Sequence, residues 1–208
     1  MFAVLIFLPA GTLGYWQGWA FLATFIAAST ALTVYMAVYD PQLLERRLRA
    51  GPRAEKETSQ KIIMFFVTLG FVAFIVFPVL DYRFHWSPVP PYVSIAGDAL
   101  ITTGFLFMFF VMKENSYAAS TIQIAEGQRV ISTGPYAVVR HPMYAGALLP
   151  IVGMPLALGS LYGLFGLFLL VPVLIWRLLD EEEFLTKNLP GYAEYKNSVR
   201  SRLIPGVF

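Results

Sequence analysis

Long apolar runs, each followed by a shorter polar segment, account for most of the sequence. Three of these runs are long enough to cross a hydrocarbon core of roughly 30 Å as α-helices: residues 16–39, 62–80 and 92–112. Trp16 and Trp19 at the start of the first run are typical of aromatic side chains at a membrane surface. The pattern predicts an all-α, polytopic integral membrane protein.

Two shorter apolar runs, 144–158 and 161–176, lie near the end of the chain. Only Gly159 and Ser160 separate them, so they predict a tight helical hairpin. The N-terminal run is also apolar, but it is marginal for a full span. We therefore predict five transmembrane helices, a short N-terminal apolar segment and a polar, amphipathic C-terminal tail over residues 177–208.

Basic residues predict the orientation of the chain in the membrane. Most Lys and Arg residues lie in three polar segments, 42–61, 113–143 and 177–208, whereas the turn 81–91 contains only Arg83. All three basic segments fall on one side of the membrane when the predicted helices are counted. Because cytoplasmic loops carry an excess of Lys and Arg, we expect this side to face the cytoplasm.

Composition narrows the chemistry that this chain can perform. The sequence is 57% hydrophobic and 13% charged, with a formal net charge of +2, no cysteine and two histidines. We therefore expect no disulfide, no cysteine-based metal site, no multi-histidine metal site and no nucleic-acid partner. No linker or internal repeat divides the sequence, which predicts a single domain made of an N-terminal helical half (1–112) and a C-terminal half (113–208).

The first group of candidate functional residues is the segment GPYAVVRHPMYAG at 134–146. Gly134 and Pro135 predict a turn, and Pro142 suits the first turn of the helix that follows. Backbone N–H groups at the start of that helix are suited to hold a carboxylate. The alternative is a helix-capping turn with an arginine and tyrosines at the membrane surface.

The second group is Arg177 followed by four consecutive acids at 180–183, where the last apolar run ends. Acids at this position are suited to a positively charged ligand, and the alternative is a solvated start to the tail. Arg177 and Glu182 are about 140° apart on an ideal helix, so they face one site only if the helix bends or each meets a different partner. A third group, GYAEY and then LIPG in the tail, is usual for anchors at a membrane surface.

Together these segments resemble the isoprenylcysteine carboxyl methyltransferase family and the related membrane phospholipid methyltransferases. The resemblance rests on GPY followed by RHPMYAG, on Arg177 with the acidic pair Glu181 and Glu182, and on GYAEY and LIPG. It covers about residues 113–208, and the N-terminal half is similar only in being helical. The glycine fingerprint G-x-G-x-x-G is absent, unlike in soluble nucleotide-binding methyltransferases.

The resemblance implies a methyltransferase that binds S-adenosylmethionine at the cytosolic side of its C-terminal half. It assigns seven residues to the cofactor site: Tyr136, Arg140, His141, Tyr144, Gly146, Glu181 and Glu182. It also assigns Arg177 and Glu182 to catalysis beside the acceptor group. The expected partner is a lipid or a prenylated, amphiphilic acceptor that enters from the bilayer.

The acceptor chemistry stays open at this point. A carboxylate acceptor needs a cation to orient it, which Arg177 can supply through a bidentate contact. An amine acceptor needs a base, for which Glu182 is the candidate. Two other classes also stay open, an NADPH-dependent membrane reductase of sterol-like lipids and a non-enzymatic membrane scaffold. The acids beside the candidate cofactor segment favour a sulfonium cation over a polyanionic dinucleotide.

Overall fold

The computed structural model describes residues 2–48, 58–118, 124–125 and 127–208, and for residues 58–67 it describes the backbone alone. Within these residues the secondary structure is entirely helical, which confirms the all-α prediction. The elements are α1 (Phe2–Ala10), α2 (Trp16–Tyr39), α3 (Pro41–Leu48), α4 (Thr58–Phe84), α5 (Pro91–Glu114), η1 (Gly134–Ala137), α6 (Pro142–Ala157), η2 (Tyr162–Gly166), α7 (Leu167–Asn188) and α8 (Tyr192–Ser198).

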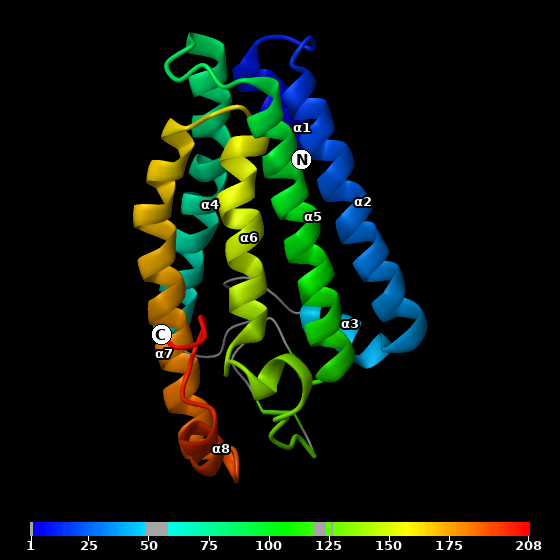
Figure 1. Ribbon diagram of the computed structural model, residues 1–208, viewed down its shortest axis with the longest axis vertical. Coiled ribbons are helices and arrows are strands. Elements are labelled where there is room, and N and C mark those ends of the chain that lie inside the picture. Colours follow the sequence, from blue (N-terminus) through cyan, green and yellow to red (C-terminus); the bar gives the residue numbers. More distant parts are fainter. Residues whose placement is uncertain (1, 49–57, 119–123, 126) are drawn as a thin grey trace.

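The long helices form a bundle with two chemically different ends (Figure 1). The short elements α3, η1 and α8 gather at one end, which we call the site end. The connections α1–α2, α4–α5 and α6–α7 lie at the other, which we call the far end. The site end therefore contains the described parts of the three basic segments. Residues 49–57 and 119–123 of these segments lie outside the described residues.

Three helices among the described residues are long and apolar enough to cross a membrane: Trp16–Tyr39, Pro91–Glu114 and Tyr162–Asn188. Helix α6 is apolar but has 16 residues, which corresponds to a length of roughly 24 Å. The structure therefore supports three of the predicted transmembrane helices, and the total of five stays a prediction.

The predicted hairpin is confirmed, but its second arm is longer than expected. Gly159 adopts a left-handed conformation at φ +74° after α6, and the chain returns through η2 into α7. Helix α7 does not end at residue 176 but continues to Asn188. The charged start of the predicted tail thus continues the same helix, with its Leu178 and Glu182 buried.

Helices α5 and α6 pack closely because glycines face each other along their contact. A Cβ atom added to Gly97 would lie 2.2 Å from the backbone nitrogen of Ala157, and one added to Gly153 would lie 2.6 Å from the carbonyl oxygen of Gly97. Nearer the site end, a Cβ atom on Gly104 would lie 2.9 Å from the carbonyl oxygen of Gly146. This contact fixes where α6 begins and hence where the 134–146 segment lies.

Candidate active site

A cavity of about 370 Å³ opens at the site end of the bundle. Its wall comes from α3, the segments that follow α5, the first two turns of α6, residues of α7 between Val173 and Leu185, and helix α8. The volume falls within the range of small-molecule sites in proteins. Six of the eight predicted site residues are in the wall: Tyr136, Arg140, His141, Tyr144, Arg177 and Glu181.

Tyr136 is held in η1 by contacts from two other elements. Its hydroxyl accepts a hydrogen bond from Asn115 Nδ2 at 2.9 Å, and its carbonyl oxygen accepts one from the Tyr195 hydroxyl at 2.7 Å. Gly134 starts this turn with φ +55°, a conformation that glycine adopts readily. Burial raises the pKa of Tyr136, so its hydroxyl stays protonated at neutral pH.

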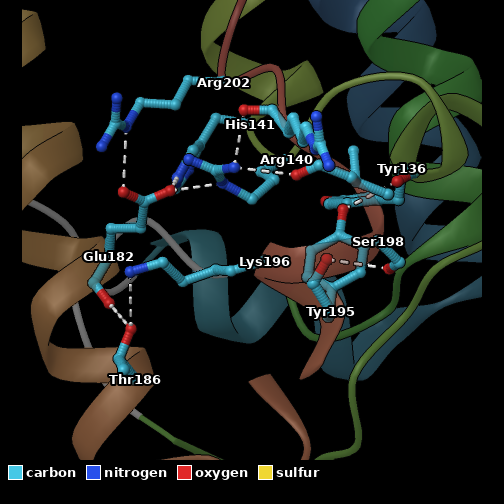
Figure 2. Close-up of polar contacts among 11 residues, drawn as sticks. Tyr136, Arg140, His141, Glu182, Thr186, Tyr195, Lys196, Ser198 and Arg202 are labelled. Carbon is cyan, nitrogen blue, oxygen red and sulfur yellow. Dashed lines mark hydrogen bonds and ion pairs between the residues drawn. The ribbon is translucent and has the colours of Figure 1, made fainter. Parts of the chain in front are cut away.

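Arg140 lines the cavity and joins three segments of the chain (Figure 2). Its Nε donates to Glu182 Oε1 at 2.5 Å, and its Nη1 donates to the carbonyl oxygens of Val199 and Arg200, both at 2.8 Å. The backbone of the same stretch is paired too, because Arg140 N donates to Ser201 O at 3.0 Å. The C-terminal segment is thus bound directly to the start of α6.

Glu182 lies at the centre of this ion-pair group. Its two carboxylate oxygens accept from Arg140 and from Arg202 Nε, the latter at 3.0 Å. Figure 2 also shows His141, whose Nε2 is 3.6 Å from Glu182 Oε1, which is too long for a hydrogen bond. Glu182 is 3% exposed and lies behind the wall of the cavity rather than in it. The ion pair with Glu182 holds Arg140 where it lines the cavity.

A second group lies on the neighbouring face of α7. The Tyr144 hydroxyl donates to Glu181 Oε2 at 2.6 Å, and the Arg177 charge lies close enough to interact electrostatically with Tyr144. Arg177 and Glu181 are one helical turn apart and both line the cavity, whereas Glu182 faces Arg140 and Arg202. Arg177 and Glu182 therefore point to different sides of α7, and each contacts its own set of partners.

The polarity of the side chains in the cavity wall changes along the axis of the bundle. Ala147, Val173 and Leu174 line the cavity about one helical turn deeper than Tyr144 and Arg177. Three tyrosines line the other part of the cavity: Tyr136, Tyr192 and Tyr195. Tyr144, Arg177 and Glu181 thus separate an apolar part from a part rich in aromatic and polar groups. Within the described chain, no three His, Cys, Asp or Glu side chains form a group that could hold a metal ion.

The structure places Gly146 at the contact of α6 with α5 and not in the wall of the cavity. A Cβ atom there would lie 2.9 Å from Met108 Cγ and 2.9 Å from Phe107 Cδ1. Gly146 is buried in this contact. Because Gly146 has no side chain, α6, the helix that carries Tyr144, packs closely against α5.

The cavity also includes side chains that the sequence did not single out. Arg47 lines it from α3, and its Nη1 donates to Ala118 O at 3.1 Å. Burial lowers the pKa of Arg47. Asn115 lines it from the end of α5. The only sequence signal for Arg47 was the basic character of the 42–61 segment, which does not distinguish one arginine from its neighbours.

The comparisons with known proteins bear on this part of the chain. Residues 92–191 match the family model described as phospholipid methyltransferase. This match covers 100 of the 208 residues of the chain. A search of curated proteins returned no match.

The family match confirms the resemblance to membrane phospholipid methyltransferases and indicates a methyltransferase that acts on lipids. The matched stretch runs from the start of α5 to Gly191 and contains all eight predicted site residues. Arg47, Tyr192 and Tyr195 line the same cavity from outside this stretch. The site therefore extends beyond the part of the sequence that the family model covers.

Proposed function

We propose that this chain is an S-adenosylmethionine-dependent methyltransferase whose acceptor is a membrane lipid or another amphiphile. The observation that carries the proposal is the position of Glu181 in the cavity wall, between an apolar part and a part rich in tyrosines. A carboxylate and aromatic ring faces are the groups that proteins use to bind sulfonium and ammonium cations. The basic site end supports a cytoplasmic orientation for this cavity.

The residues of the cavity fit this cofactor. When bound, S-adenosylmethionine supplies an electrophilic methyl group on a positively charged sulfur. We propose that Glu181 and the tyrosine rings hold this charge, and that Arg140 and His141 line the polar end of the same site, with Tyr144 beside Glu181. Glu182 is a positioning residue in this proposal, because Arg140 and Arg202 already engage both of its oxygens.

The chain contributes mainly alignment and exclusion of water in such a reaction. With the cofactor held beside Glu181 and the tyrosine rings, its methyl group would be available to an acceptor lone pair, and the electron pair of the broken carbon–sulfur bond would stay on sulfur. We propose that the acceptor's apolar chain lies along Ala147, Val173 and Leu174, which brings its polar end to Arg177 and Glu181. Arg177 is suited to orient a carboxylate acceptor, whereas Glu181 is suited to take the proton from an amine acceptor.

The test is calorimetric titration of the purified protein in detergent with S-adenosylmethionine, and with NADPH in parallel. Glu181→Gln removes the proposed carboxylate and is expected to weaken S-adenosylmethionine binding by about tenfold or more. Glu183→Gln is the matched control, because it changes the net charge equally at the next-but-one position. The Glu183 side chain is 66% exposed and pairs with Lys187, so affinity is expected to stay unchanged.

The same protein in vesicles distinguishes the acceptors. Transfer of a labelled methyl group to an amine-headgroup phospholipid supports N-methylation, and transfer to a prenylated peptide carboxylate supports O-methylation. Saturable binding of NADPH without S-adenosylmethionine binding would overturn the proposal in favour of a reductase. If neither compound binds to folded protein, the scaffold alternative replaces it.

A further inference from the structure

Helix α8 carries two tyrosines that lie side by side but differ in their hydrogen bonding. Gly191 precedes the helix in a left-handed conformation at φ +83°, which turns the chain from α7 into α8. Tyr192 and Tyr195 are 4% and 5% exposed, and their ring centroids are 5.7 Å apart. Both line the cavity.

The Tyr195 hydroxyl is part of the fold. It donates to the carbonyl oxygen of Tyr136 at 2.7 Å and so joins α8 to η1. The Tyr192 hydroxyl is also buried, but it has no hydrogen-bond partner among the described residues. Buried hydroxyl groups in proteins nearly always have a partner, and leaving one without a partner is destabilising. Tyr192 therefore has an unused hydrogen-bonding group at the wall of a ligand-sized cavity.

The surroundings of this hydroxyl keep it neutral. Burial raises the pKa of Tyr192, and the nearby carboxylates of Glu182 and Glu181 raise it further, against the opposing effect of Arg140. A protonated phenol both donates and accepts one hydrogen bond. The group is therefore suited to a polar, uncharged partner such as a hydroxyl or a ring nitrogen.

We propose that Tyr192 is a cofactor-binding residue whose hydroxyl forms a hydrogen bond with a polar group of S-adenosylmethionine. This inference rests on the proposed function. Its position favours the cofactor over the acceptor, because Tyr192 follows the end of α7 and lies in the polar part of the cavity. The apolar part, at Val173 and Leu174, is several helical turns away along α7. Tyr192 lies just outside the stretch matched by the family model.

The two tyrosines provide a matched test, Tyr192→Phe and Tyr195→Phe in the full-length protein. Each variant loses one hydroxyl from the same helix and the same cavity. In the absence of ligand, the unfolding temperature of Tyr192→Phe is expected to equal that of the wild type or to lie slightly above it. The variant is expected to bind S-adenosylmethionine about five- to tenfold more weakly. Tyr195→Phe is expected to unfold a few degrees lower, because it loses a hydrogen bond within the fold.

Each other outcome has a distinct meaning. Unchanged affinity of Tyr192→Phe overturns the inference and leaves the proposed function intact. A higher KM for the acceptor with unchanged cofactor affinity assigns the hydroxyl to the acceptor and also overturns it. If the folded wild type does not bind S-adenosylmethionine, the proposed function fails and the inference fails with it.

Discussion

The far end and the site end of the bundle each bury a carboxylate, but the groups around it differ. Asp81 in α4 is 1% exposed and accepts hydrogen bonds from Ser87 N at 2.7 Å, from the Ser87 hydroxyl and from the Ser160 hydroxyl. Glu182 in α7 is 3% exposed and accepts from Arg140 and Arg202. One acid is surrounded by neutral donors and the other by cations.

We interpret the Asp81 group as a structural contact between helices and the Glu182 group as a contact that positions side chains of the cavity wall. The Asp81 group connects α4 with the α6–α7 connection, where Ser160 Oγ also accepts from Gly163 N at 2.7 Å. Asp81, Ser87 and Ser160 do not line the cavity. The partners of Glu182 include Arg140, which does line it. The buried acid at the site end therefore contacts a residue of the cavity wall, whereas the buried acid at the far end does not.

The largest effect is expected from Glu182→Gln, which leaves the buried Arg140 guanidinium without its counter-ion. Breaking a buried ion pair from one side destabilises a protein by about 3–5 kcal/mol. We expect a large fall in unfolding temperature, with weaker S-adenosylmethionine binding in the fraction that stays folded. Thermal unfolding and calorimetry in the same detergent measure both quantities.

Glu183→Gln is the control for Glu182→Gln, because its carboxylate is exposed and pairs only with Lys187 at the surface. Exposed pairs contribute little to stability. If Glu182→Gln were as stable as Glu183→Gln, the ion-pair group would not hold the site end together, and the contrast with Asp81 would lose its basis.

A smaller and purely structural effect is expected from Asp81→Asn. The amide nitrogen of asparagine cannot accept the hydrogen bonds that the serine hydroxyls donate, so part of the Asp81 group loses its partners. We expect a loss of about 2 kcal/mol in the free energy of unfolding. Affinity for S-adenosylmethionine, measured well below the unfolding temperature, should stay at the wild-type value. A tenfold change in affinity would mean that the far end is coupled to the cavity.

The helices and the hairpin could be predicted because hydrophobic pattern and turn residues determine them locally. The burial of Glu182 could not be predicted because four consecutive acids are also typical of a solvated helix, whereas in the fold Glu182 has buried cationic partners. Those partners come from residues 42 positions earlier and 20 positions later in the chain. No periodicity within a helix encodes such contacts.

The site residues were predicted as a group, but their separate roles required the fold. The angle between Arg177 and Glu182 indicated either a bent helix or a different partner for each residue, and it did not identify Arg202 as a partner. The tyrosines of α8 were interpreted from sequence as surface anchors. Their burial follows from the packing of α8 against residues near Val130 and Tyr136, which are far away in the sequence.

The smallest effect is expected from Gly146→Ala, which tests the packing of α6 against α5 near the site end. The added methyl group would lie 2.9 Å from both Met108 Cγ and Phe107 Cδ1, so the flexible Met108 side chain and the Phe107 ring must both shift slightly. Overpacking of this kind destabilises a protein by about 1 kcal/mol. We expect a small fall in unfolding temperature, measured by thermal unfolding, and an unchanged affinity for S-adenosylmethionine by calorimetry. A variant that is fully stable but binds the cofactor weakly would show instead that Gly146 contacts the ligand, as the family resemblance implied.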